Sequence, residues 1–415
     1  MEPTTCRGEQ YGQSVRNQFW LGDAVAMLPE LIEQYAGTVQ VIYLDPPFST
    51  GDAFEYRAQL GKNKLGTLSI EAYRDDLPED EYFAMMRKVL EGCHTLLSDE
   101  GSLYLHVDFR TGPYFKIMLD EIFGRQNFLN EIIWHYKSGG RAKSYFSRKH
   151  DTIYFYRKSR AVYFDITSVG MPRGKEMQNH MKRSFDEEGR LVYTIKSAGK
   201  TYTYSEDTPV YPSDVWTDIS HLQQKDPERT GYDTQKPEAL LRRILSASSR
   251  EDDLVMDLFS GSGTTAAAAL SLNRRFVVAD RSPIAMQVLR RRILQRESTL
   301  MDLAGPSIRF QYDPDAFSAL GELSVQCRRE NGRADVVLYD YVPPEGCTPP
   351  VGVEGLQLIE FCAVGSVREG VFVPDSFHQR PNRGGKISAN YFVPERENLA
   401  LLVTDVFANQ QIYLL

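Results

Sequence analysis

The sequence predicts an α/β protein with a doubly wound sheet, an inserted lobe and a small all-β C-terminal domain. Three observations support this. Apolar, β-branched runs alternate with amphipathic helical runs, which is typical of parallel sheets covered by helices. The run 39–44 ends in Asp45 followed by two prolines, and the run 253–259 leads into a Gly-x-Gly turn. Open α/β sheets bind their ligands at such carboxyl ends of strands.

The first half of the chain supplies one set of these elements. In chain order we expect a strand, turn and helix within 17–31, a strand at 39–45, a long loop at 49–77, a helix at 78–97, a strand at 101–108 and a helix at 113–123. Residues 130–136 and 152–156 are predicted to be paired strands joined by a basic loop. A loop as long as 49–77 beside a binding strand is typical of a functional or mobile segment.

The second half supplies the other set. In chain order we expect an amphipathic helix at 236–249 with Pro237 in its first turn, a strand at 253–259, an alanine-rich helix at 266–272, a strand at 275–280 and a helix at 283–297. Proline is well suited to a first helical turn, because its missing N–H needs no partner there. Beyond residue 306 the sequence has short alternating runs, which indicate strands.

These patterns divide the chain into four parts. We expect a catalytic half of the main domain at 1–158, a target-recognition lobe at 159–230, a cofactor-binding half at 231–305 and a β domain at 306–415. The lobe is distinguished by a polar composition with short β-like runs, while 231–305 returns to strand and helix alternation.

Composition excludes several classes of protein. Hydrophobic content of 42% and charged content of 25% are ordinary for a globular protein. The five cysteines are scattered without C-x-x-C spacing, so neither a disulfide framework nor a structural zinc site is predicted. No apolar run approaches the length of a membrane span, and the first residues do not resemble a signal peptide. We therefore expect a reduced cytosolic protein with no membrane partner.

A basic stretch stands out against the net charge of −8. Between residues 137 and 160 there are eight Lys or Arg residues and one acid, interleaved with aromatic residues. Such a stretch can contact phosphates and stack on bases, and a solvated face over a core strand is the alternative.

The loop after the strand 39–44 has the groups needed to hold a planar heterocycle with an exocyclic amine. The strand stops at Asp45, because proline cannot donate to a sheet ladder. Asp45 and the carbonyl of Pro46 can accept hydrogen bonds from the amine, while Phe48 offers a flat face for stacking. Pro47 stiffens the turn. The alternative is a Pro-Pro turn after a core strand.

The segment 257–265 has the form of a cofactor-binding loop. Gly261 and Gly263 allow a tight turn and close approach of a ligand to the backbone. Asp280 ends the next strand, where a carboxylate can accept hydrogen bonds from ribose hydroxyls. No third glycine completes a dinucleotide fingerprint and no lysine follows the glycines, so a nucleoside cofactor without a pyrophosphate fits better. S-adenosylmethionine is such a cofactor.

Four motifs together resemble the amino-methylating DNA methyltransferases of the β class. They are Asp45-Pro46-Pro47-Phe48, Asp214 to Ile219, Gly231 to Glu238 and Asp257 to Thr265. The segment Asp45 to Gly51 is similar to modification subunits of type III restriction systems and related solitary enzymes. Phe48 stands where this family more often has tyrosine. The resemblance covers residues 17–300 and implies a Rossmann-like methyltransferase sheet.

The resemblance implies roles for individual residues. The catalytic set is Asp45, Pro46, Pro47 and Phe48. The cofactor set is Asp23, Asp45, Gln235, Lys236, Pro237, Asp257, Phe259, Ser260, Gly261, Ser262, Gly263, Thr264, Thr265 and Asp280. The nucleic-acid set is Lys137, Arg141, Lys143, Arg148, Lys149, His150 and Tyr154. For Asp23 a helix N-cap is the alternative, and for Lys236 an exposed first-turn lysine. No metal is expected.

The implied activity is site-specific methylation of N6 of a flipped adenine in double-stranded DNA, with S-adenosylmethionine as the donor. Methylation of cytosine N4 on the same scaffold is the first alternative, and the family associates Asp-Pro-Pro mostly with adenine. A catalytically silent DNA-binding or assembly subunit is the second. A homodimer and a restriction subunit are further partners that the resemblance leaves open.

Overall fold

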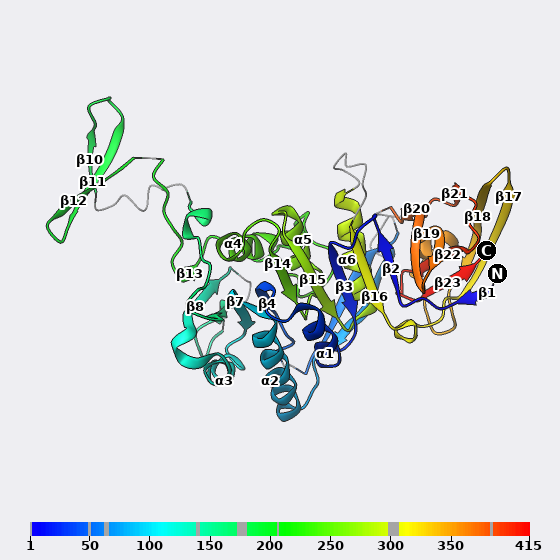
Figure 1. The fold of residues 1–415 in the computed structure, drawn as a ribbon, viewed down its shortest axis with the longest axis horizontal. Coiled ribbons are helices and arrows are strands. Elements are labelled where there is room, and N and C mark those ends of the chain that lie inside the picture. Colours follow the sequence, from blue (N-terminus) through cyan, green and yellow to red (C-terminus); the bar gives the residue numbers. More distant parts are fainter. Residues whose placement is uncertain are drawn as a thin grey trace.

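A single mixed sheet of 15 strands runs through the molecule (Figure 1). The computed structural model describes residues 2–48, 51–61, 66–137, 142–171, 181–205, 207–297, 307–381 and 385–415. The parallel part of the sheet consists, in spatial order, of β16 (Ile308–Tyr312), β3 (Asn17–Leu21), β15 (Arg275–Asp280), β14 (Leu254–Asp257), β4 (Val39–Leu44) and β7 (Leu97–Val107). The order continues with β9 (His150–Arg157) and β8 (Phe128–His135), which are antiparallel, and β13 (Val215–Trp216). The predicted doubly wound α/β class is confirmed.

Strands β14 and β4 lie side by side although they come from the two ends of the methyltransferase-like region. Val255 pairs with Val41 and Met256 with Ile42, in parallel. From β14 the chain continues through a helix to β15 on one side, whereas from β4 it continues to β7 on the other side. A crevice forms at the carboxyl ends of two parallel strands whose connections diverge in this way.

Helices cover both faces of the parallel strands. On one face lie α1 (Ala24–Tyr35), α2 (Glu79–Leu96) and α3 (Gly112–Leu119), and on the other α4 (Glu238–Ser248), α5 (Thr264–Ser271) and α6 (Pro283–Glu297) (Figure 1). Alternate side chains of β4 enter the two cores: Val41 and Tyr43 join one, and Ile42 and Leu44 the other. Burial on both faces explains why this strand is a continuous apolar run.

Three expectations about local structure are wrong in detail. The segment expected to be a loop at 49–77 contains a hairpin of β5 (Ala53–Gln59) and β6 (Thr67–Arg74). Its strands pair with each other, and the N–H of Arg57 also donates to the carbonyl of Gly231; charge and glycine content did not reveal this pairing. Helix α4 begins at Glu238, so Pro237 is its N-cap. Helix α3 ends at Leu119 and continues as a π-helical turn, Asp120–Gly124.

The inserted segment forms a small sheet of its own. Its strands are β10 (Lys182–Phe185), β11 (Leu191–Ser197) and β12 (Lys200–Ser205), paired in antiparallel order. Figure 1 shows this sheet projecting from the end of the molecule beyond β8 and β13. Most of its residues are exposed or half-buried, because it has only three strands and little to pack against.

The C-terminal part is built from strands, with short 3-10 turns between them. One sheet contains β17 (Glu322–Glu330), β18 (Arg333–Val342) and β21 (Asn390–Pro394). The strands β19 (Ile359–Arg368), β20 (Val371–Gln379), β22 (Leu399–Asp405) and β23 (Gln410–Leu414) extend the large sheet, together with β1 (Glu2–Thr4) and β2 (Gly8–Tyr11). The 3-10 turns of this part among the described residues are Pro314–Ala316 and Gly355–Leu358, while Arg125–Asn127 and Ile166–Val169 lie earlier in the chain. Strands from both ends of the chain therefore build this part, and β16 belongs to the parallel sheet although it follows residue 306.

No helix in the described part of the chain combines the length and the apolar character that crossing a membrane requires.

Arg290 of α6 ties the parallel sheet to the C-terminal strands. Its guanidinium, 2% exposed, donates to Glu9 at 2.6 Å, to Thr404 at 3.0 Å and to Gln410 at 2.9 Å. Glu9 is completely buried. A buried ion pair contributes little by itself, but removal of one partner leaves an uncompensated charge in the core.

We expect Arg290→Met to lower the free energy of unfolding by about 3–5 kcal/mol, because the Glu9 carboxylate loses its cation. Urea denaturation followed by circular dichroism measures this. Arg250→Met is the matched control, since the Arg250–Glu100 pair is about half exposed and its loss should cost under about 1 kcal/mol. Equal effects of the two substitutions would contradict the role given to Arg290.

Candidate active site

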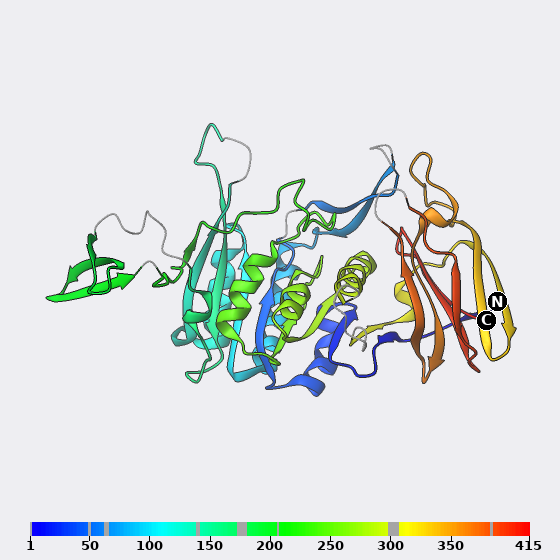
Figure 2. The same ribbon diagram turned by 90° about the horizontal axis from the view of Figure 1, so that it is seen from above.

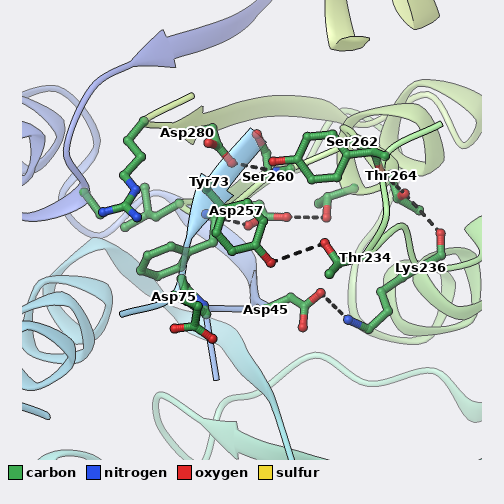
Figure 3. Close-up of a pocket in the computed structure, with 18 of the residues that line it drawn as sticks. Asp45, Tyr73, Asp75, Thr234, Lys236, Asp257, Ser260, Ser262, Thr264 and Asp280 are labelled. Atoms are coloured by element: carbon green, nitrogen blue, oxygen red, sulfur yellow. Dashed lines mark hydrogen bonds and ion pairs between the residues drawn. The ribbon is translucent and has the colours of Figure 1, made fainter. Parts of the chain in front are cut away.

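A pocket opens at the carboxyl ends of β3, β4, β14 and β15 (Figure 3). Its lining comes from six segments: Gly22 to Ala24, Tyr43 to Pro47, Tyr73 to Leu77, Tyr232 to Lys236, Asp257 to Thr265, and Asp280 with Arg281. Met85 and Leu241 complete it. The predicted loops after β4 and β14 therefore meet in one cavity.

The two carboxylate oxygens of Asp45 differ in their hydrogen-bond partners. Lys236 Nζ donates to Oδ2 at 2.5 Å, and both side chains are about 15% exposed (Figure 3). Oδ1 is buried and has no hydrogen-bond partner among the described residues. Lys236 Nζ also lies 5.5 Å from the centre of the Phe48 ring. The carboxylate thus has a cation on one oxygen and an open acceptor on the other.

Neighbouring side chains hold the proline turn in place. Tyr82 of α2 donates to the carbonyl of Pro47 at 2.5 Å, and the N–H of Phe48 donates to Asp75 Oδ2 at 2.8 Å. Neither proline has an N–H to offer, so the turn depends on these external partners. They keep the Phe48 ring beside Asp45.

A chain of buried polar groups lies beneath Phe48. The Tyr43 hydroxyl is 2.8 Å from His106 Nδ1, and His106 Nε2 is 3.1 Å from Asp151 Oδ2. Tyr136 donates to the other oxygen of Asp151 at 3.0 Å. Burial alone would raise the pKa of Asp151, but the hydrogen bond and charge of His106, with Lys236 nearby, hold it below its ordinary value. The centres of the Phe48 and His106 rings are 6.3 Å apart.

The loop after β14 is shaped by hydrogen bonds to two carboxylates. Asp257 accepts from the N–H of Phe259 at 3.0 Å and from the Thr265 hydroxyl at 2.5 Å. Asp280 accepts from the N–H of Gly261 at 2.8 Å. Gly263 has φ +74°, and an added Cβ would lie 2.7 Å from Leu289, so only glycine fits at this position.

Burial perturbs both of these carboxyl groups. Desolvation raises the pKa of Asp257 to about 7, against the lowering effect of its hydrogen bonds. Desolvation likewise raises the pKa of Asp280, while the N–H groups of Ser282 and Gly261 oppose the rise. Carboxyl groups with pKa values shifted by burial are typical of functional sites.

The hairpin β5–β6 and the loop before α4 together cover the pocket. The N–H of Arg57 donates to the carbonyl of Gly231 at 2.9 Å, and a Cβ on Gly231 would lie 2.1 Å from the Arg57 carbonyl oxygen. Tyr73 stacks on Phe54 at 4.9 Å and on Tyr232 at 6.3 Å. Sequence analysis did not identify Tyr73 or Tyr232 as site residues. The alternation of aromatic and polar residues in 53–59 and 67–74 was the available signal.

Three buried polar atoms of the pocket lack hydrogen-bond partners among the described residues: Asp45 Oδ1, Ser260 Oγ and the Tyr232 hydroxyl. An orphaned buried polar atom costs free energy unless a ligand or water satisfies it. The set therefore suits a ligand with several polar groups, as S-adenosylmethionine has, and Asp280 lies at the same wall of the pocket.

Most of the residues predicted to bind a cofactor line this pocket. They are Asp23, Asp45, Lys236, Asp257, Phe259, Ser260, Gly261, Ser262, Thr264, Thr265 and Asp280. Asp23 also accepts from the N–H groups of Val25 and Ala26, so it is the N-cap of α1 as well. Their contact with a cofactor stays a prediction.

Five predicted residues do not line the cavity: Pro46, Phe48, Gln235, Pro237 and Gly263. Gln235 turns inward, where its side chain accepts from Thr230 at 2.7 Å and donates to the carbonyl of Glu228 at 2.9 Å. Both ends of the Gln235 amide therefore stabilise its own loop, and its place in the cofactor set stays a prediction. Gly263 acts through the turn that it permits.

The predicted nucleic-acid residues differ in their positions. Lys137, Lys143, Arg148 and His150 are exposed and Lys149 is half-buried, whereas Arg141 and the motif residues Ser49 and Thr50 lie outside the described residues. Tyr154 is 5% exposed and packs in a core, so its assignment to a DNA-contacting surface is wrong. Side chains of a strand alternate between faces, and both faces of β9 are covered, since Tyr154 lies in one core and Ile153 and Phe155 lie in the other.

The family model for DNA methylases matches residues 39–290, more than half of the chain and every wall of the pocket except the segment 22–24. The chain belongs to the DNA methylase family. The predicted resemblance is thereby confirmed. In this DNA methylase the loop that begins at Asp45 precedes the loop 257–265 in the sequence. The parallel pairing of β4 and β14 places the two loops side by side.

Curated relatives agree with this assignment. The chain is 30% identical over 275 residues to the DNA adenine methyltransferase YhdJ of Escherichia coli, covering 66% of this chain and 81% of that protein. It is 24% identical to the StyLTI Mod subunit, a type III restriction-modification enzyme of Salmonella typhimurium, covering 62% of this chain and 50% of the subunit.

Two solved structures are similar to this chain at lower sequence identity than these relatives. The M1.HpyAVI–SAM complex is 17% identical with a TM-score of 0.40, covering 66% of this chain and 98% of that one. The PvuII cytosine-N4-specific DNA methyltransferase is 16% identical with a TM-score of 0.44, covering 72% and 92%.

We expect Asp257→Asn to remove a pH-dependent part of the stability. The folded-state pKa is near 7 and the ordinary value is 3.8, so the folded protein binds the proton more tightly. This contribution is complete below about pH 4 and is lost as pH rises to about 7, by at most about 1.4 kcal/mol per pH unit.

Urea denaturation of both proteins between pH 4 and pH 8 measures this difference. The free energies of wild type and Asp257→Asn should diverge across the window and run parallel above pH 7. Asp315→Asn, at an exposed carboxylate, is the control and should follow wild type. Parallel curves for Asp257→Asn throughout would contradict the raised pKa.

Proposed function

We propose that this DNA methylase transfers a methyl group from S-adenosylmethionine to N6 of an adenine flipped out of a specific DNA sequence. The observation that carries the proposal is Oδ1 of Asp45, a pocket-lining residue: this oxygen is buried and has no hydrogen-bond partner in the part of the chain that the structure describes. An amine N–H is the donor that such an oxygen lacks. A base inside a duplex cannot reach this position, so it must leave the stack.

The pocket residues suit the parts of this cofactor. S-adenosylmethionine supplies an activated methyl group on its sulfonium. We assign the ribose hydroxyls to Asp280 and the methionine end to the loop from Phe259 to Thr265. The aromatic pair Tyr73 and Tyr232 covers the cavity from the hairpin side. Asp23 lies at the N-terminus of α1, and we assign it to the adenine amine of the cofactor.

Asp45 and the Pro46 carbonyl activate the exocyclic amine. The lone pair of this nitrogen is delocalised into the ring, and hydrogen bonds from its N–H groups to both acceptors localise it. When bound, S-adenosylmethionine would supply the methyl group to this nitrogen and keep the electron pair of the broken carbon–sulfur bond, and the amine proton would leave to Asp45 or water. Preorganised acceptors stabilise the positive charge that develops on nitrogen. Lys236 holds Oδ2, so that Oδ1 faces the amine.

Adenine is the proposed base because the DNA adenine methyltransferase YhdJ matches this chain over 81% of its own length. Cytosine N4 stays the alternative, since the same acceptors suit either amine and the PvuII enzyme, with the fold in common, acts on cytosine N4. The projecting sheet of β10 to β12 is the proposed sequence reader, since an antiparallel ribbon can enter the major groove.

Double-stranded DNA, at the nucleoid of a prokaryotic or phage-infected cell, is the proposed partner. A homodimer and a restriction subunit are proposals that rest on the family alone. Light scattering of the purified protein tests the first, and co-purification with a nuclease subunit tests the second.

We expect Asp45→Asn to lower methyl transfer to DNA at least about 100-fold, because the amide replaces an ionised acceptor at the reacting nitrogen. Binding of S-adenosylmethionine, measured by calorimetry, should change little. Transfer of tritiated methyl groups measures the rate. Asp252→Asn is the control, at an exposed carboxylate whose φ of +64° asparagine tolerates. A variant with the wild-type rate would refute the role of Asp45.

The methylated nucleoside identifies the base. Digestion of the modified DNA and mass spectrometry should yield N6-methyladenine, and N4-methylcytosine as the sole product would refute adenine. Single-molecule sequencing of DNA from cells that express the protein gives the sequence context.

A further inference from the structure

The loop between β8 and β9 presents an aromatic side chain to solvent. Phe146 is 97% exposed, and its neighbour Tyr145 is 59% exposed. Lys143 and Arg148 flank the pair. Phe146 therefore packs little against the rest of the chain, and with Tyr145 it forms an exposed aromatic pair beside two cations.

The base of this loop is braced. The Arg148 guanidinium lies 3.9 Å from the centre of the Phe109 ring and 4.9 Å from that of Tyr145. The N–H of Ala142 donates to Ser147 Oγ at 3.1 Å, and the N–H of Tyr136 donates to the Lys149 carbonyl at 2.9 Å. Phe146 is therefore carried on a supported turn.

The stem of the loop adjoins the catalytic turn. Trp134 of β8 pairs with Asp151 of β9, and Asp151 contacts His106, which lies against Phe48. Figure 2 shows the loop and the β5–β6 hairpin rising from the same side of the sheet. A duplex whose flipped base reaches Asp45 would pass between these two projections.

We propose that Phe146 inserts into the DNA duplex and fills the space left by the flipped base. This inference rests on the proposed function. Extrusion of a base loses its stacking on both neighbours, and an aromatic ring in the gap restores part of it. Apolar wedges act in this way in proteins that distort DNA, and the cations beside Phe146 suit the phosphates on either side.

A protein partner is the competing occupant of an exposed aromatic residue. The charges favour DNA, because 137–160 holds eight basic residues and one acid in a chain of net charge −8. The stem of the loop also adjoins the turn that would hold the target base. A residue that docks another protein would not need to lie there.

The test compares Phe146→Ala with wild type on two DNA substrates. One duplex has the target base paired, and the other has an abasic site opposite the target, so that extrusion costs little. We expect kcat/KM of Phe146→Ala to fall about tenfold on the paired duplex and to stay within about twofold of wild type on the abasic duplex. Phe146→Trp should retain activity on both.

Phe392→Ala is the matched control, since Phe392 is 74% exposed on β21 in the C-terminal part. It should follow wild type on both substrates. Fluorescence of 2-aminopurine at the target position should rise on binding of wild type and less with Phe146→Ala.

An equal loss on both substrates would overturn the inference, because Phe146 would then act in binding alone. No loss on the paired duplex would overturn it as well. Wild-type protein that methylates neither substrate would instead overturn the proposed function, and this inference with it.

Discussion

The parallel pairing of β14 with β4 is the constraint on which the rest of the structure depends. Val255 beside Val41 and Met256 beside Ile42 place Asp257 and Asp45 at neighbouring strand ends. Each strand brings its own loop to the same edge, one suited to a nucleoside and the other to an amine. The connections diverge from this point, so the edge stays open as a pocket. A strand inserted between β14 and β4 would separate the two loops.

Five aspartates line that pocket, and three of them, Asp45, Asp257 and Asp280, are accommodated differently. Asp45 pairs with Lys236, which the loop before α4 brings from far along the chain. Asp280 accepts backbone N–H groups, and Asp257 accepts one backbone N–H and one hydroxyl. Burial raises the pKa of Asp257 and Asp280, and the charges of Asp45 and Asp280 add to the rise at Asp257. Only Asp45 has an oxygen without a partner among the described residues, and that oxygen distinguishes a reacting group from a supporting one.

The C-terminal strands support the cover of the pocket. Tyr56, Leu60 and Leu68 of the hairpin region share a hydrophobic core with α6 and with the strands after residue 320. The hairpin in turn pairs with the loop at Gly231. The β domain, to which sequence analysis assigned no role, therefore helps to hold Tyr73 and Tyr232 over the cavity. Arg290 of α6 also links the parallel sheet to the C-terminal strands, through its ion pair with Glu9.

The sequence by itself determined the fold class, the two loops and the family, because strand ends, prolines and glycines are local signals. Asp45, Gly261 and Asp280 could be assigned from their places at the ends of apolar runs. Only the tertiary structure decided which partners these residues have. Lys236 on Asp45 and the burial of Tyr154 depend on contacts between distant segments. Local patterns carry no information about such contacts.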